Sequence, residues 1–199
     1  TDGSHIKGLM MNFFRHFWPS LLKPTIDGEE DDKPFLSSFI TPLLKATRKG
    51  RKETKSFYNM AEYNDWRSSL DPENDVSKWN VKYYKGLGTS TPTEAKEYFK
   101  AFDSHHRPFS WKSCKDGELL DMVFDKERAS DRRDWILSEY DENASLAVDE
   151  SNSVTYEDFV NKEMIHFSNG DNIRSLPSVI DGLKPSQRKV LFACFKRNL

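Results

Sequence analysis

Hydrophobic residues near the start of the chain follow a helical period. Apolar side chains recur at three- and four-residue spacing over residues 6–17, and Pro19 follows them. This spacing places one apolar stripe along a helix, and proline disrupts a helix interior. Asp2-Gly3, just before the stripe, is a turn signal. The pattern therefore predicts a helix that is entered from a tight turn and ends before Pro19.

Three short runs rich in β-branched and aromatic residues predict strands. They are residues 39–44, with Pro42 at an edge or a bulge, 56–59 and 79–84. A basic segment crosses a turn at Gly50 between the first two runs. We interpret it as a hairpin tip with solvated charges, and a nucleic-acid patch is the alternative. Its basic residues are Lys45, Arg48, Lys49, Arg51, Lys52 and Lys55.

Residues 85–94 carry the clearest local signature. Thr91 can cap a helix, Pro92 suits its first position and Glu94 completes a capping box. We expect this helix to run to about residue 102. The preceding Gly86-x-Gly88 lacks the third glycine of the dinucleotide fingerprint, and Lys85 precedes the glycines, whereas the P-loop lysine follows them. A structural turn and a loop that supports a DNA phosphate or a metal both remain open.

The remaining chain alternates helical and irregular patterns. We predict helices over residues 60–70, 119–124, 125–140, 156–167 with Thr155 as cap, and from Pro185 onward. Residues 107–117 are predicted to be irregular, 141–154 a polar linker, and 168–181 a loop. The mixture of strands and helices predicts an α/β fold with a helical final part.

Composition excludes several classes of protein. The 199 residues are 31% charged and 36% hydrophobic, with a net charge of −2, so the chain as a whole does not have the charge of a polyanion binder. No apolar run approaches the roughly 20 residues of a membrane helix, so we expect no membrane span. Cys114 and Cys194 have no zinc or disulfide spacing, which favours a reducing intracellular compartment.

Positive charge is nevertheless concentrated locally. Residues 170–199 hold six basic and two acidic residues. Lys184 lies directly before Pro185, at a helix entrance where cation and free amides suit a phosphodiester. Arg132 and Arg133 are adjacent and suit phosphate contacts, although the flanking aspartates make ion pairs an equal alternative.

Few residues point to metal or catalytic chemistry. Asp2, placed at the end of an expected strand, suits a hard cation, but stabilisation of the Asp-Gly turn is the preferred interpretation. His5, near a helix start, is interpreted as a structural residue. The chain has no nucleophile elbow and no H-E-x-x-H motif.

Three motifs together resemble the eukaryotic type II DNA topoisomerases: Asp-Gly-Ser-His-Ile-Lys-Gly-Leu at 2–9, Lys-Tyr-Tyr-Lys-Gly-Leu-Gly-Thr-Ser at 82–90, and Asp-Gly-Leu-Lys-Pro-Ser-Gln-Arg-Lys-Val-Leu at 181–191. The resemblance covers essentially the whole chain. It implies the latter part of a Toprim domain with insertions (1–107), a helical Toprim extension and linker (108–154), and the first helices of a winged-helix DNA-gate region (155–199). We expect the chain to be one piece of a larger protein.

The resemblance also implies function. Members of this family are ATP-dependent homodimers that cut both strands of double-stranded DNA through paired tyrosines, pass a second duplex and reseal the first. It implies DNA contacts at Arg132, Arg133 and Lys184, and a Toprim Mg²⁺ ligand at Asp2. Mg²⁺ and ATP are expected for the intact enzyme, and neither is expected to bind this piece. The family's Arg-Tyr pair is absent from the sequence, so we place no catalytic residue in this chain.

Alternatives and location follow from the same resemblance. A non-catalytic DNA-binding or protein-interaction module is one alternative function, and a bacterial gyrase-like relative is the other. The gyrase type would normally divide this region between two chains, so the continuous chain favours the eukaryotic enzyme. The resemblance implies a nuclear protein.

Overall fold

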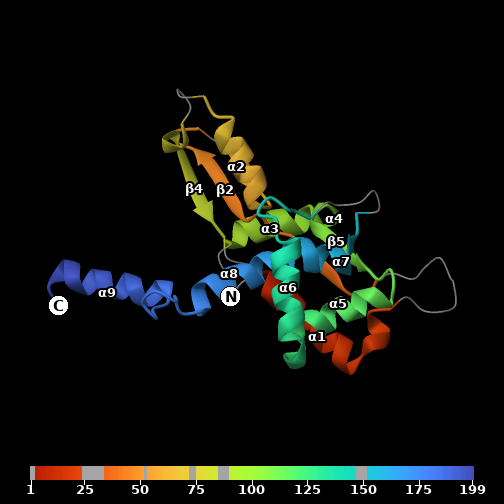
Figure 1. Cartoon of the computed structure of the whole chain (residues 1–199). Helices are drawn as coiled ribbons and strands as arrows, with labels where there is room; N and C mark the ends of the chain where they lie inside the picture. The colour runs from red at the N-terminus through yellow and green to blue at the C-terminus, as the bar shows by residue number, and fades with distance from the viewer. Residues whose placement is uncertain (1–2, 24–33, 52, 72–74, 85–89, 147–151) are drawn as a thin grey trace.

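The computed structural model describes residues 3–23, 34–51, 53–71, 75–84, 90–146 and 152–199. Its described part has the predicted mixed α/β character, with two three-stranded sheets and helices around them. One sheet projects from a body that is mainly helical, and the last helix extends away from that body (Figure 1). The sheet and the last helix therefore leave large surfaces exposed on either side of the body.

The projecting sheet is antiparallel with the order β3-β2-β4. Its strands are β2 (Leu44–Arg48), β3 (Thr54–Phe57) and β4 (Trp79–Tyr83). Helix α2 (Met60–Ser68) begins at Asn59, whose side chain accepts the Glu62 N–H, and packs against one face of the sheet. A small core joins them, in which the Trp66 and Trp79 ring centroids lie 5.1 Å apart.

The second sheet belongs to the body. Its strands are β1 (Ser37–Phe39), β5 (His106–Ser110) and β6 (Val154–Thr155). Strand β5 pairs antiparallel with β1 and parallel with β6. The parallel pair joins Phe109 to Val154, so two distant segments of the chain meet in one sheet.

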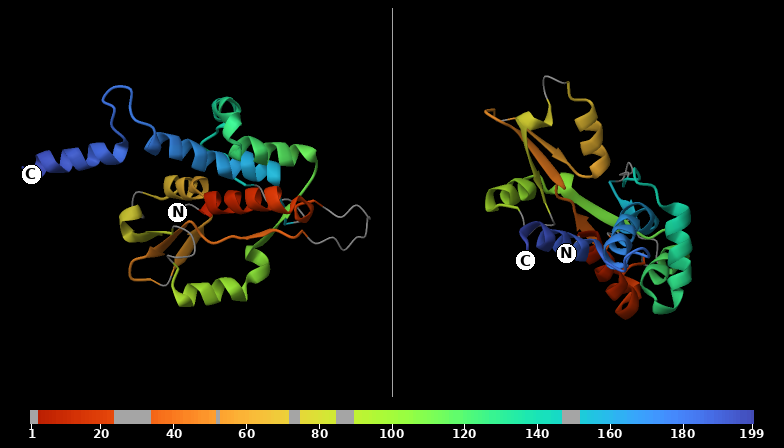
Figure 2. Two further views of the ribbon diagram at one scale, coloured as in Figure 1. Left: turned by 90° about the horizontal axis from the view of Figure 1, so that it is seen from below. Right: turned by 60° about the vertical axis from the view of Figure 1, so that its left-hand side comes forward.

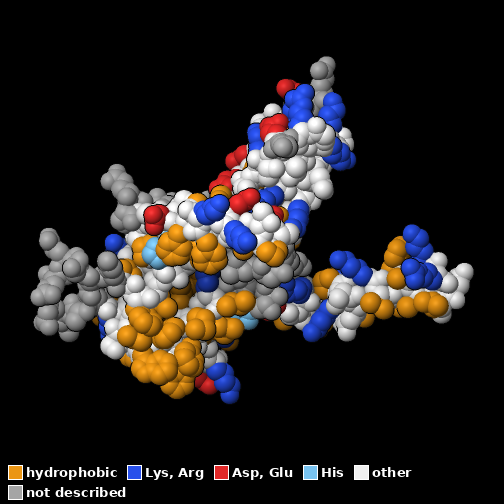
Figure 3. Space-filling view, turned by 180° about the vertical axis from the view of Figure 1, so that it is seen from behind, with side chains coloured by type: hydrophobic (Ala, Val, Ile, Leu, Met, Phe, Trp, Pro, Cys, Tyr) orange, Lys and Arg blue, Asp and Glu red, His pale blue; other side chains and the backbone are white. Residues whose placement is uncertain are grey.

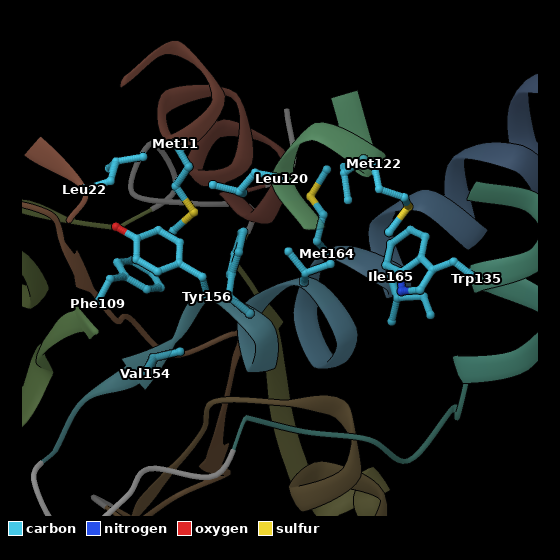
Figure 4. Close-up of a cluster of buried hydrophobic side chains, with 13 residues drawn as sticks. Met11, Leu22, Phe109, Leu120, Met122, Trp135, Val154, Tyr156, Met164 and Ile165 are labelled. Atoms are coloured by element: carbon cyan, nitrogen blue, oxygen red, sulfur yellow. The ribbon is translucent and has the colours of Figure 1, made fainter. Parts of the chain in front are cut away.

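Helices from both ends of the chain enclose the main core. They are α1 (Gly3–Phe17), α5 (Cys114–Phe124), α6 (Ala129–Glu139), α7 (Tyr156–Phe159), the π-helical turn η6 (Val160–Met164) and α8 (Ile165–Ser175). Figure 4 shows Met11, Leu120, Tyr156 and Ile165 converging in this core, and each is at least 98% buried. The core therefore spans the sequence-predicted boundary at residue 155. The three domain boundaries themselves stay predictions.

Short elements complete the described chain. They are the 3₁₀ turns η1 (Pro19–Leu21), η3 (Val76–Lys78) and η5 (Lys126–Arg128), and the helices α3 (Pro92–Lys100), α4 (Phe102–His105) and α9 (Pro185–Arg197). The capping box at Thr91 and Glu94 is confirmed. Helix α9 has no buried residue, and Figure 2 shows it extending clear of the other helices. No helix of the described residues has the length and apolar character needed to cross a membrane.

Two sequence-based strand and loop predictions are wrong in the first part. Residues 39–44 do not form one strand, because the chain leaves β1, passes Pro42 and enters β2 in the other sheet. Residues 107–117 are not irregular, because they hold most of β5 and the start of α5. Ser113 and Asp116 form a capping box that begins α5, and Asp116 is only 2% exposed.

Two further corrections concern the later part. Val154, at the end of the predicted linker, is a strand residue and is 2% exposed. The predicted loop over 168–181 begins too early, because α8 continues to Ser175 through Gly170. A glycine within a helix costs only about 1 kcal/mol relative to alanine, and the Arg174–Asp171 ion pair lies within the same helix at 2.9 Å.

Candidate nucleic-acid interface

Helix α6 positions the first two predicted DNA contacts. Trp135 faces the core, and its indole Nε1–H donates to Asn161 Oδ1 at 2.9 Å. This bond fixes α6 against η6, so the rotation of α6 about its axis is set. Arg132 and Arg133 consequently point in different directions although they are neighbours in sequence.

Arg132 is held against the end of α5. Its Nη1 donates to the carbonyl oxygen of Met122 at 3.0 Å and also to that of Asp125. The last carbonyls of a helix lack partners within the helix, so a guanidinium there stabilises the helix end. Arg132 thus has a structural role that the sequence did not indicate. No hydrogen bond from its Nε or Nη2 to a described residue is present.

Arg133 faces solvent on the opposite side of α6. Its side chain is 68% exposed, and its Nε and Nη2 donate to Asp134 Oδ1 at 2.9 and 2.8 Å. An exposed ion pair of this kind contributes little to stability. A phosphate could therefore replace the Asp134 carboxylate as partner at low energetic cost.

Lys184 is presented by a braced turn at the start of α9. Gly182 has a φ of +68°, in the left-handed region, and the Lys184 N–H donates to Gln187 Oε1 at 2.8 Å. Pro185 occupies the first helical position. The helix therefore begins with its free amides and the Lys184 ammonium close together, which is an arrangement that suits an anion.

An exposed ion pair braces that turn. Arg188 donates to Asp181 through Nε at 2.8 Å and Nη2 at 2.7 Å, and the Leu183 N–H donates to Asp181 Oδ1 at 3.0 Å. The Arg188 hydrogen bonds, followed by the Leu183 amide, lower the pKa of Asp181 to about 2 from 3.8. Arg188 is therefore committed to the turn, whereas Lys184 is the cation presented at its end.

We expect Arg188→Gln to raise the pKa of Asp181 toward its ordinary value, because the largest cause of the lowering is removed. Carbon-detected NMR titration of the Asp181 carboxyl group would measure this change. Arg174→Gln, which breaks a different exposed ion pair in α8, should leave the pKa of Asp181 unchanged. An unchanged pKa in the Arg188→Gln protein would show that the brace is absent in solution.

The three predicted DNA contacts do not form one cluster. Arg132 and Arg133 lie on α6, and Lys184 lies at the start of α9, which extends away from the body (Figure 1). The structure thus offers two separate cationic positions on the described surface. A ligand that contacts both must be extended.

A node around Glu94 was not foreseen from the sequence. Glu94 accepts from the Thr91 N–H at 2.7 Å and from the buried Tyr84 hydroxyl, and its carboxylate lies 3.4 Å from Lys45 Nζ and 3.6 Å from Lys82 Nζ. Burial alone would raise the pKa of Glu94, but the hydrogen bonds from Thr91 and Tyr84 and the nearby Lys45 outweigh it and lower the pKa to about 2. The sequence indicated only its capping role.

The predicted metal and loop residues are placed differently. Asp2 and residues 85–89 lie outside the described residues. Within the described ranges, no group of three or more His, Cys, Asp or Glu side chains could hold a metal ion. His5 stacks on Phe167 with a centroid distance of 4.3 Å, in keeping with a structural role.

Comparison with known proteins identifies two matching family models. The model described as the C-terminal associated domain of TOPRIM matches residues 39–172. A second model, which describes the A chain of DNA gyrase/topoisomerase IV, matches residues 174–199. Together the two matches cover most of the chain.

Individual proteins are similar over nearly the whole chain. A protein named DNA topoisomerase 2 from Arabidopsis thaliana is 50% identical over 98% of this chain, and DNA topoisomerase 2, mitochondrial, from Dictyostelium discoideum is 48% identical over all of it. The chain spans only 12% and 14% of their lengths. A crystal structure of the topoisomerase II DNA-binding, cleavage and re-ligation domain of Plasmodium falciparum matches 99% of this chain and 25% of its own, with 44% identity and a TM-score of 0.75. The resemblance to eukaryotic type II topoisomerases is thereby confirmed.

Proposed function

The chain belongs to the family of the C-terminal associated domain of TOPRIM, and from this premise we propose that it is part of an ATP-dependent type II DNA topoisomerase. The observation that carries the proposal is the 50% identity to a DNA topoisomerase 2 over 98% of the chain. In such an enzyme, tyrosine hydroxyls attack the phosphodiesters of one duplex and conserve the bond energy in phosphotyrosine links. This chain supplies DNA-backbone contacts to that reaction.

We assign those contacts to Arg133, Lys184 and Arg132. Arg133 exchanges its exposed Asp134 partner for a phosphate, and Lys184 adds a cation at the free amides of α9. Arg132 keeps Nη1 on the α5 carbonyls and uses its other edge for a phosphate. These are backbone contacts, so they position DNA without reading its sequence.

The intact enzyme is proposed to use Mg²⁺ and ATP and to act as a homodimer. Mg²⁺ would stabilise negative charge that develops on phosphate oxygens. The described residues do not fit a metal site, and Asp2 lies outside them, so we derive no step through the ion. Asp2 remains the proposed ligand within this chain.

We propose a nuclear location for the protein. Because one similar protein is named as mitochondrial, imaging of a tagged full-length protein with nuclear and mitochondrial markers would decide the location. Signal confined to mitochondria would refute the proposal.

A salt series tests the proposed DNA contacts. Each lost phosphate contact lowers the slope of log affinity against log salt by about 0.9. We expect Arg133→Ala/Lys184→Ala in the intact protein to reduce the slope for a labelled duplex by about two, and addition of Arg132→Ala to bring the reduction to about three. The measurement is fluorescence anisotropy, with ATP- and Mg²⁺-dependent supercoil relaxation as a second readout.

The matched control removes charge from another exposed surface. Lys96→Ala/Lys100→Ala changes two lysines on α3 and should leave the slope unchanged. Thermal unfolding separates the Arg132 roles, because loss of its contacts to α5 should lower stability as well. Equal slopes for wild type and the Arg133/Lys184 variant would refute the site assignment. Duplex binding without any relaxation would favour the non-catalytic module.

A further inference from the structure

The outer end of the projecting sheet carries a dense group of cations. Residues 45–57, which include β2, the turn and β3, contain six basic residues and one acidic residue, in a chain whose net charge is −2. Figure 3 shows Lys and Arg side chains gathered at this end of the projection. We call the surface formed by Thr47, Arg48, Lys49, Gly50, Arg51 and Asn80 the basic tip, and these residues line one shallow hollow.

The basic tip has a well-defined backbone. Gly50 has a φ of +75°, and the Arg48 N–H donates to the Glu53 carbonyl at 2.9 Å across the hairpin. The Lys49 N–H donates to the Lys78 carbonyl at 2.9 Å, which ties the turn to the segment before β4. No atom lies within 4 Å of the position that a Gly50 Cβ would occupy. A ligand can therefore approach the backbone closely at this turn.

The cations of the tip are only partly neutralised by carboxylates. Glu53 lies 3.4 Å from Arg48. Lys49 Nζ instead donates to the Ser77 carbonyl at 2.8 Å, which fixes the ammonium without cancelling its charge. The exposed guanidinium of Arg51 has no ion pair or hydrogen bond with the described residues. A solvated hairpin of balanced charge would not present cations in this way.

Neutral hydrogen-bonding groups lie beside these cations. Thr47 pairs with Thr54 and with Asn80 across the three strands, so all three side chains lie on one face. The two threonine hydroxyls are 3.3 Å apart. Hydroxyl, amide and cationic groups on one exposed surface are the types of group that contact DNA phosphates and sugars.

We propose that the basic tip binds the phosphate backbone of duplex DNA. The proposal rests on the proposed function and adds a contact apart from α6 and α9, since the tip lies at the far end of the projection (Figure 1). Charge complementarity selects a polyanion, and the face of the small sheet offers no deep pocket for a single base. The contact is therefore independent of DNA sequence and sensitive to salt.

Charge reversal in the intact protein tests the inference. We expect Lys49→Glu/Arg51→Glu to weaken binding of a fluorescein-labelled duplex on the order of tenfold and to lower the salt slope by about two. Arg51→Glu alone should lower the slope by about one. The Arg51 side chain has no described contact that folding needs, so the single variant keeps the test valid if the double variant misfolds. Lys96→Glu/Lys100→Glu is the matched control and should bind with nearly wild-type affinity.

The outcomes separate this inference from the proposed function. If the tip variants bind like the control while Arg133→Ala/Lys184→Ala binds weakly, the tip inference fails and the proposed function stands. If the tip variants lose affinity only for a single-stranded RNA or for heparin, the tip binds another polyanion and the inference also fails. If the wild-type protein binds no duplex, the proposed function fails first.

Discussion

Replacing Phe159 by alanine will lower the free energy of unfolding by about 3–5 kcal/mol. The Phe159 side chain is 0% exposed and packs edge-on against Phe109 with a centroid distance of 5.7 Å. Lys7 Nζ lies 5.6 Å from the centre of the same ring. The substitution therefore opens a cavity where α7, β5 and α1 meet. Urea denaturation followed by tryptophan fluorescence would measure the loss.

The control for this prediction is Phe195→Ala. Phe195 is 73% exposed on α9, so the same chemical change should shift stability by no more than about 0.5 kcal/mol. If both variants unfold at the same urea concentration, Phe159 does not lie in a shared core. A loss confined to Phe159→Ala would support one cooperative core that contains the segments on both sides of residue 155.

Replacing Glu94 by alanine will lower the free energy of unfolding by about 2–3 kcal/mol. The change removes the capping box of α3 and leaves the buried Tyr84 hydroxyl and the Lys45 ammonium without their carboxylate. Urea denaturation would measure the effect. Glu97→Ala, which changes an exposed residue three positions further along α3, is the matched control and should cost no more than about 0.5 kcal/mol.

The contribution of the Glu94 charge will depend on pH. The folded-state pKa of about 2 lies below the ordinary 4.5, so the charge stabilises the protein fully above pH 4.5. That stability is lost as the pH falls from 4.5 to about 2. The difference in unfolding free energy between wild type and Glu94→Gln should therefore shrink across this window. A constant difference would show that the carboxylate is not selectively stabilised in the folded protein.

Local chemistry made several elements predictable from the sequence. The Thr91–Glu94 capping box begins α3, Thr155 caps α7, and the apolar period over residues 6–17 marks α1. Such signals act within one or two helical turns, so no distant contact is needed to interpret them. The Ser113–Asp116 box at α5 carried the same kind of signal and was missed, because its third residue is Asp instead of Glu or Gln.

The candidate interface was only half predictable. The residue types and positions of Arg132, Arg133 and Lys184 were visible in the sequence, and so was the basic hairpin around Gly50. The commitment of Arg132 to the α5 carbonyls was not visible, because it depends on how α6 packs against α5. The Glu94 node likewise joins β2, β4 and α3 through side chains up to 49 residues apart.

The sequence by itself determined the α/β character, the capped helix starts, the hairpin at Gly50 and the family resemblance. Only the tertiary structure decided that the chain changes sheets at Pro42, that Val154 pairs with Phe109, and that neighbouring arginines on α6 face different partners. The physical reason is the range of the interactions. Capping and periodicity are encoded within a few residues, whereas strand pairing and side-chain direction depend on which distant surfaces become buried together.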